Sequence, residues 1–266
     1  MVSLPAGVQV QKPVGVLCTV HKCMASATAQ LLHQARRLGF KLHDIPIKIR
    51  PTNLDQAYRA QFELETLYNC KRVGFKAANT NQTSQRFLNL PEPFFGPLLE
   101  SPHVGQVGTP NSPARINLNK LQLRLCEPEV ALQVGSNGEV VAMAPALEIV
   151  HSSFLQWTHK NVGAYSLIAD LACNGAWVRG EAVPIASNLS VGCEFWVNGK
   201  LAGEGHSDNV KPLQVYAKLL ERFQPKPGDW ITTGVVCDPP YHYGQRGDLL
   251  EARFSNGLGA VAVRLE

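Results

Sequence analysis

Three glutamates stand out because each lies in an otherwise apolar run. Glu127 and Glu129 interrupt the run 123–134, and Glu148 interrupts residues 144–150. In a β-strand, residues i and i+2 point to the same face about 7 Å apart, so Glu127 and Glu129 are expected to share one face. Carboxylates on one face repel each other unless a cation or a proton lies between them.

A divalent metal ion is one way to neutralise these three carboxylates. Three glutamates supply three oxygen ligands and leave positions open for water and substrate, which suits Mg²⁺ or Mn²⁺. No histidine or cysteine joins them by spacing, which argues against Zn²⁺. The alternative interpretation is that Glu127 and Glu129 lie on a solvated strand face and bind nothing.

Other residues of interest are single polar groups in apolar surroundings. Lys76 lies among small and apolar residues, and Asp170 is a lone acid on an apolar helical segment. Thr232, Thr233 and Gly234 end a predicted strand, where a hydroxyl and a backbone N–H are available to a carboxylate. Lys76 can equally be a surface lysine whose stem covers apolar surface. Cysteines 18 and 23 with histidine 21 lack the further ligands that a zinc site needs.

The elements that must position these residues begin with helices. Apolar periodicity predicts a helix over 24–38, with arginines at 36 and 37 in its last turn and Gly39 just beyond it. A second helix is predicted from Thr52, with Asp55 completing a weak capping box, and it continues through Leu67. Two further helices are predicted over 164–173 and 212–223.

The chain changes to short β-type runs from about residue 121. Asn-Gly pairs at 198–199 and 256–257 border apolar runs and predict hairpins. A Pro-Gly-Asp turn at 227–229 leads into a predicted strand over 230–233. The stretch 101–119 is rich in Pro, Gly, Ser and Asn, which predicts a linker or an active-site loop.

Length and composition set broad limits. The chain has 266 residues, of which 45% are hydrophobic and 17% charged, which is typical of a folded protein. The net charge of +4 is too small to indicate a nucleic-acid-binding protein. No run is long enough for a membrane span, and no signal peptide is recognised. The seven cysteines are scattered and odd in number, so we expect reduced thiols and a cytoplasmic location.

Seven short motifs, taken in sequence order, resemble those of the fumarylacetoacetate hydrolase superfamily. The branch of 2-hydroxypentadienoate hydratases and 4-oxalocrotonate decarboxylases is the most similar. Each motif alone is weak, but together they extend from residue 55 to the C-terminus. They lie at 55–61, 74–76, 127–131, 145–150, 168–170 with 175–176 and 180, 197–199, and 226–229 with 233–234.

The resemblance implies an α+β fold. It consists of an N-terminal helical α/β lobe over 1–100 and a mixed β-sandwich or β-roll catalytic core over 101–266. It also implies Mg²⁺ or Mn²⁺ as cofactor, a small 2-oxo or 2-hydroxydienoic acid as substrate, and an assembly of several copies or a complex with a homologous enzyme. The implied metal ligands are Glu127, Glu129 and Glu148. The expected catalytic residues are Lys76, Asp170 and Glu92, and the expected substrate-binding residues are Thr233, Gly234 and Phe94.

Phe94 is the clearest departure from the family pattern. It stands where relatives carry an acid, and Glu92, two residues earlier, is the candidate to supply that acid instead. Relatives also carry serines where this chain has Cys173 and Asn174. An apolar pocket wall at Phe94 disfavours a charged distal group, because burying an unpaired carboxylate is costly.

The activity expected from these residues is metal-dependent hydration of a 2-hydroxy-2,4-dienoate to a 4-hydroxy-2-oxo acid, as in the catabolism of aromatic compounds. Three alternatives remain open at this point: decarboxylation of a 2-oxo-dioic acid such as 4-oxalocrotonate, hydrolysis of an acylpyruvate, and a noncatalytic subunit. The apolar wall favours a mono-acid with an apolar C5 end, and therefore the hydratase.

Overall fold

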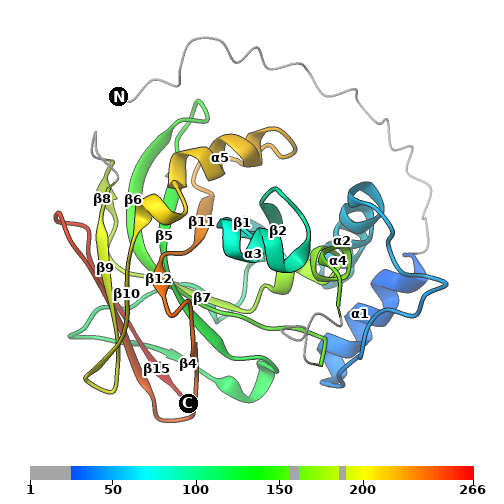
Figure 1. The fold of residues 1–266 in the computed structure, drawn as a ribbon, viewed down its shortest axis with the longest axis horizontal. Helices are drawn as coiled ribbons and strands as arrows, with labels where there is room; N and C mark the ends of the chain where they lie inside the picture. The colour runs from blue at the N-terminus through cyan, green and yellow to red at the C-terminus, as the bar shows by residue number, and fades with distance from the viewer. Residues whose placement is uncertain (1–24, 156–161, 186–189) are drawn as a thin grey trace.

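The computed structural model describes residues 25–155, 162–185 and 190–266, which fold around two curled β-sheets (Figure 1). The larger sheet has nine strands, which are β1 (Arg72–Ala78), β2 (Phe94–Leu99), β3 (Val104–Val107), β5 (Leu125–Val134), β6 (Val140–Ile149), β7 (Ala176–Arg179), β8 (Val183–Pro184), β11 (Trp230–Val235) and β13 (His242–Tyr243). Their order is β2-β1-β11-β5-β6-β7-β3, with β13 beside β5 and β8 beside β6. Strand β11 therefore lies between two strands that precede it in the chain by more than 90 residues.

The smaller sheet is built mainly from the C-terminal third. Its strands are β4 (Ala114–Ile116), β9 (Gly192–Val197), β10 (Lys200–His206), β12 (Cys237–Asp238), β14 (Leu249–Phe254) and β15 (Gly259–Leu265), in the order β12-β10-β9-β14-β15-β4. Both predicted hairpins are present. Asn198 and Gly199, which join β9 to β10, have φ of 52° and 74°, as a type I′ turn requires.

The main hydrophobic core fills the space between the two sheets. Phe75, Val130 and Ile231 of the large sheet pack there with Phe195 and Val261 of the small sheet. Because side chains alternate along a strand, the residues between these positions point to the opposite face of the large sheet. That opposite face carries the polar residues of interest.

A second cluster packs the helices against one end of the large sheet (Figure 1). Its helices are α1 (Ala27–Leu38), α2 (Leu54–Tyr68) and α4 (Ala164–Ala169), and two others, α3 (Gln82–Leu88) and α5 (Pro212–Leu220), lie elsewhere along the strands. Helix α1 ends at Gly39 with φ of 76°, as predicted. Helix α2 begins two residues later than predicted, because Asn53 rather than Thr52 caps it by accepting a hydrogen bond from the N–H of Gln56.

Two segments differ from the prediction. The helix predicted over 164–173 ends at Ala169, and η3 (Leu171–Cys173) is a 3₁₀ turn with left-handed backbone. The stretch 101–119, predicted as a linker or loop, contains β3 and β4. These two strands are only four and three residues long and pair with β7 and β15, so they are too short to show an alternating pattern.

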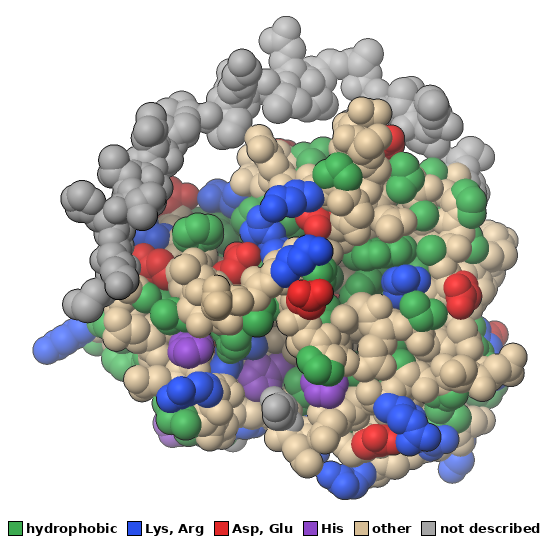
Figure 2. All heavy atoms as spheres, turned by 180° about the vertical axis from the view of Figure 1, so that it is seen from behind, with side chains coloured by type: hydrophobic (Ala, Val, Ile, Leu, Met, Phe, Trp, Pro, Cys, Tyr) green, Lys and Arg blue, Asp and Glu red, His purple; other side chains and the backbone are tan. Residues whose placement is uncertain are grey.

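The predicted domain boundary at residue 100 falls between β2 and β3, which belong to the same sheet, and it stays a prediction. The cysteines at 18 and 23 and the histidine at 21 lie outside the described residues. Within the described ranges, no helix is both long and apolar enough to span a membrane. Basic and acidic side chains are interspersed over the face shown in Figure 2.

Candidate metal centre

The strand register brings the three glutamates together. In the antiparallel pair β5–β6, Glu127 lies opposite Glu148, and Glu129 lies opposite Ala146. Directly paired residues share a face of the sheet, and so do residues i and i+2, so all three carboxylates project from the same face. One oxygen from each carboxylate lies within 4.8 Å of the others.

These carboxylates are strongly desolvated. Glu129 is 0% and Glu148 1% exposed, and both oxygens of Glu129 are buried without a hydrogen-bond donor. Burial, and then the negative charge of Glu148, raise the pKa of Glu127 to about 8 and that of Glu129 well above its usual value. Buried oxygens without donors are costly, and a bound cation would satisfy them. The cluster therefore fits a hard divalent ion.

Lys76 is the positive charge beside this cluster. Its Nζ lies 3.0 Å from Oε1 of Glu148 and donates a hydrogen bond of 3.1 Å to the carbonyl of Ala172. Burial alone would lower the pKa of Lys76, but the three neighbouring glutamates outweigh burial and raise it. Three carboxylates and one ammonium have a formal charge of −3 + 1 = −2, which one divalent ion balances.

Of the two threonines at the end of β11, the sequence interpretation chose Thr233 for substrate binding, whereas the structure places Thr232 beside the glutamates. Thr232 pairs with Lys76 in β1 and with Ala131 in β5, so it lies on the same face as the glutamates, and its hydroxyl is buried without a partner. Thr233 points to the other face, where its hydroxyl donates to the carbonyl of Val130 at 2.8 Å. The hydroxyl predicted to bind a substrate carboxylate is therefore already committed. Alternation from a core position at Ile231 would have selected Thr232.

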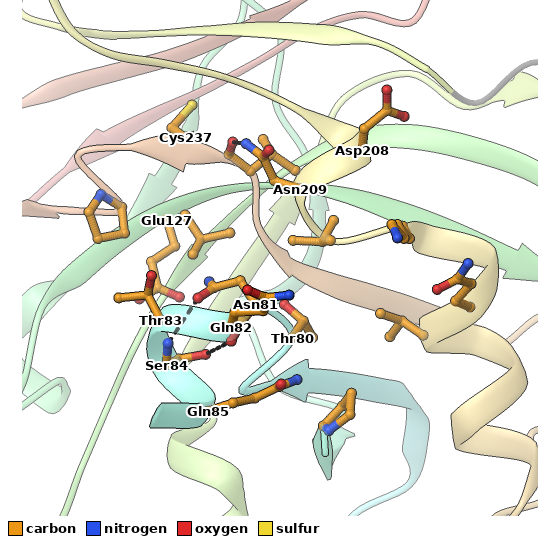
Figure 3. Close-up of a pocket in the computed structure, with 18 of the residues that line it drawn as sticks. Thr80, Asn81, Gln82, Thr83, Ser84, Gln85, Glu127, Asp208, Asn209 and Cys237 are labelled. Carbon is orange, nitrogen blue, oxygen red and sulfur yellow. Dashed lines mark hydrogen bonds between the residues drawn. The ribbon is translucent and has the colours of Figure 1, made fainter. Parts of the chain in front are cut away.

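Two connected cavities lie beside the cluster. The inner pocket has a volume of about 120 Å³ and is lined by Lys76, Glu127, Gly234 and a set of apolar side chains, which are Phe87, Leu88, Phe94, Val150 and Leu167. The outer cleft measures about 1200 Å³ and is mostly polar along the 80–85 segment. Figure 3 shows Glu127 in this cleft with the 80–85 segment, Asp208 and Asn209 around it. Glu127 lines both cavities and so connects them to the carboxylate cluster.

The remaining predicted residues have different placements. Phe94 is 2% exposed and forms part of the inner pocket wall. Glu92 is half-buried and lines neither cavity, and its backbone carbonyl accepts a hydrogen bond from Asn79. At Gly234, which has φ of 93°, a Cβ would lie 2.1 Å from the hydroxyl oxygen of Thr80, so this position requires glycine.

Asp170 is fully buried but lines neither cavity. Its carboxylate accepts hydrogen bonds from Nε of Arg36 at 2.5 Å, and from the N–H and hydroxyl of Ser153 at 2.8 and 2.9 Å. Asp170, the predicted catalytic acid, therefore forms a buried ion pair with Arg36.

Comparisons with known proteins identify the fold. Neither a family model nor a curated protein matches the chain in sequence. The structure is similar to 4-oxalocrotonate decarboxylase from Pseudomonas putida G7, complexed with magnesium and adipate, with a TM-score of 0.78 and 18% identity over 90% of this chain and 96% of that one. It is also similar to fumarylpyruvate hydrolase from Pseudomonas aeruginosa, in complex with Mn²⁺ and pyruvate (TM-score 0.58, 17% identity, 74% of this chain and 89% of that one).

A third similar structure is 5-carboxymethyl-2-hydroxymuconate delta-isomerase from Mycobacterium smegmatis, with a TM-score of 0.53 and 12% identity over 74% of this chain and 80% of that one. These three proteins carry different activities on one architecture. The predicted α+β fold of the fumarylacetoacetate hydrolase type is therefore confirmed.

Proposed function

We propose that this chain is a divalent-metal-dependent enzyme of the fumarylacetoacetate hydrolase superfamily that adds water to a 2-hydroxy-2,4-dienoate, giving a 4-hydroxy-2-oxo acid. The observation that carries this proposal is the group of three glutamates within 4.8 Å, two of them fully buried, beside a buried lysine and an apolar pocket. The metal ions bound to two proteins of similar fold support it.

Glu127, Glu129 and Glu148 are the residues that would hold Mg²⁺ or Mn²⁺. When bound, such an ion supplies Lewis-acid charge for the carboxylate and 2-oxygen of the substrate. An all-oxygen donor set suits these hard cations, and the −2 charge of the surrounding side chains matches one of them.

Lys76 would serve as a fixed positive charge facing the substrate. Its ammonium forms an ion pair with Glu148, donates a hydrogen bond to the carbonyl of Ala172 and lines the inner pocket. Since its pKa is raised, Lys76 stays protonated and would stabilise negative charge that develops on the substrate, rather than act as a base.

The inner pocket favours a mono-acid. Its larger apolar side chains are Phe87, Leu88, Phe94, Val150, Leu167 and Val235. Lys76 and Glu127 are its charged groups, and its neutral polar side chains are Asn79, Thr80, Asn81 and Ser84. A second substrate carboxylate among the apolar side chains would be buried without a partner, which is unfavourable. An apolar C5 end fits, and this supports the hydratase over a decarboxylase of a dioic acid.

Decarboxylation of a 2-oxo-dioic acid is the second candidate, because the similarity to the P. putida decarboxylase extends over 90% of the chain. Acylpyruvate hydrolysis and a noncatalytic role are further possibilities that the same fold allows. The assembly state, the cytoplasmic location and the role in aromatic catabolism stay predictions.

The deciding experiment uses the purified chain with Mg²⁺. Loss of the dienol absorbance of 2-hydroxypenta-2,4-dienoate, with the 4-hydroxy-2-oxo acid identified by NMR, would support the hydratase. Release of CO₂ from 4-oxalocrotonate without hydration would instead assign the decarboxylase. Binding of Mn²⁺ without turnover of either acid or of an acylpyruvate would assign a noncatalytic subunit.

A further inference from the structure

The turn that follows α4 has an unusual backbone. Leu171, Ala172 and Cys173 have φ of 54°, 52° and 62°, which places three successive non-glycine residues in the left-handed region. In this region the Cβ of an L-residue lies too close to a neighbouring carbonyl oxygen, so such residues normally occur singly. A run of three persists only where the surrounding structure holds it.

Arg36, from α1, holds this turn at both ends. Its Nε and Nη2 donate to the carboxylate and the backbone carbonyl of Asp170, at 2.5 and 2.7 Å, and its Nη1 donates to the carbonyl of Asn174 at 2.9 Å. The planar guanidinium can make these three bonds at once, which a lysine ammonium in one position cannot do. Ser153 completes the coordination of the Asp170 carboxylate with two hydrogen bonds.

The other side of the turn reaches the candidate metal centre. The carbonyl of Ala172 accepts the 3.1 Å hydrogen bond from Lys76, and Ala172 and Cys173 line the inner pocket. The turn can approach this closely because β2 has Gly96 at the contact, where a Cβ would lie 2.3 Å from the carbonyl oxygen of Leu171. One face of the turn therefore contacts Arg36 and the other contacts Lys76.

We propose that Arg36 and Asp170 are a positioning pair that fixes the ammonium of Lys76 through the carbonyl of Ala172. The ion pair with Glu148 is a single contact, and a single contact leaves the Lys76 ammonium free to rotate about it. The hydrogen bond to the Ala172 carbonyl is the second contact, and the position of this carbonyl depends on the left-handed turn. Asp170 thus acts at a distance from the reacting atoms, and helix α1 sets the geometry of a residue in the sheet. This holds for any reaction in which Lys76 takes part.

The test compares Arg36→Met and Arg36→Lys with Arg50→Met. Arg50 is a matched control, because it also combines an ion pair, 3.1 Å to Asp44, with a hydrogen bond to a backbone carbonyl in the same lobe. The first readout is acetylation of Lys76 by acetic anhydride in the folded protein, quantified by peptide mass spectrometry. It needs no substrate, so it decides the proposal even if the proposed reaction is wrong.

We expect Lys76 in both Arg36 variants to be acetylated several-fold faster than in wild type, and Arg50→Met to match wild type. If an activity is established, kcat should fall at least about tenfold in Arg36→Met, since small misplacements of a catalytic group are costly. The Mn²⁺ affinity should change far less. Unchanged Lys76 acetylation in folded Arg36→Met would overturn the proposal, and so would an equal rise in Arg50→Met.

A milder variant covers the case in which Arg36→Met does not fold. Ser153→Ala removes one of the two hydrogen bonds from Ser153 to Asp170 and leaves the backbone N–H in place. We expect it to raise Lys76 acetylation in the same direction, by a smaller factor. Acetylation equal to wild type in this variant would contradict the role of Asp170.

Discussion

Replacing Glu129 by glutamine should change stability in opposite directions with and without metal. Glu129 is fully buried, and neither of its carboxylate oxygens has a hydrogen-bond donor. In the metal-free protein its pKa lies well above 4.5, so folding binds a proton that the unfolded chain has lost at neutral pH. Glutamine is neutral in both states, and it removes this cost.

The size of the effect follows from the raised pKa. A carboxyl group that stays protonated in the folded state, with an ordinary pKa of 4.5 in the unfolded state, destabilises folding by about 1.4 kcal/mol for each pH unit above 4.5. At pH 7 this amounts to at most about 3.5 kcal/mol. In EDTA, Glu129→Gln should therefore be more stable than wild type by about 1–3 kcal/mol.

With saturating Mg²⁺ the order should reverse. Wild type gains about 2.7 kcal/mol when the free metal is a hundredfold above its Kd, whereas the variant has lost a ligand and gains little. Urea unfolding followed by tryptophan fluorescence, with EDTA or Mg²⁺, measures both arms. Glu204→Gln, an exposed position on β10, is the control that should show neither effect. Equal stabilisation of wild type and Glu129→Gln by Mg²⁺ would refute the metal site.

Lys76→Met should lower turnover about a hundredfold while Mn²⁺ affinity, measured by EPR titration, changes much less; equal turnover would show that the lysine has no catalytic part. The metal-free protein should lose stability as pH rises from about 4.5 to 8, because the pKa of Glu127 is raised to about 8 in the folded state, and Mg²⁺ should flatten this pH profile of urea midpoints. In side-by-side assays the chain should turn over an alkyl dienoate faster than a dioic 2-oxo acid, and the opposite order would contradict the apolar pocket argument. The turnover rate of Glu92→Gln should stay within about twofold of wild type, because the Glu92 carboxylate lies outside both cavities. Gly234→Ala should destabilise by about 2 kcal/mol or more in urea unfolding, and Gly257→Ala by about 1 kcal/mol, since both have positive φ but only the former has a clash at Cβ.

The convergence of the three glutamates could be predicted from the sequence because each of them interrupts an apolar run. Glu127 and Glu129 are two residues apart in an apolar run, and Glu148 interrupts a second such run. The strand pairing that places them together is the ordinary consequence of a long β-hairpin, β5–β6. The helices α1 and α2 and the Asn-Gly hairpin between β9 and β10 likewise follow from local caps and turns.

The features that could not be predicted have no local signal in the sequence. The left-handed turn at residues 171–173 contains no glycine, so its conformation depends on Arg36, which is more than 130 residues away in sequence. The choice between Thr232 and Thr233 depends on which of two adjacent residues faces the core, and this is set by pairing with β1 and β5. Asp170 was predicted to be catalytic because it is a lone acid in an apolar helical run, and its ion-pair partner Arg36 becomes visible only in the fold.

The position of β11 has a consequence for how the site is made in the cell. This strand contains Thr232 and lies between β1, which contains Lys76, and β5, which contains Glu127 and Glu129. A ribosome that has released only the first two hundred residues has supplied the lysine and all three glutamates but not the strand that joins them. The sheet then closes late, through contacts of high sequence separation, which are slow to form. Until β11 has emerged and paired, β1 and β5 present unpaired edges, and the nascent chain is most vulnerable to aggregation in that interval.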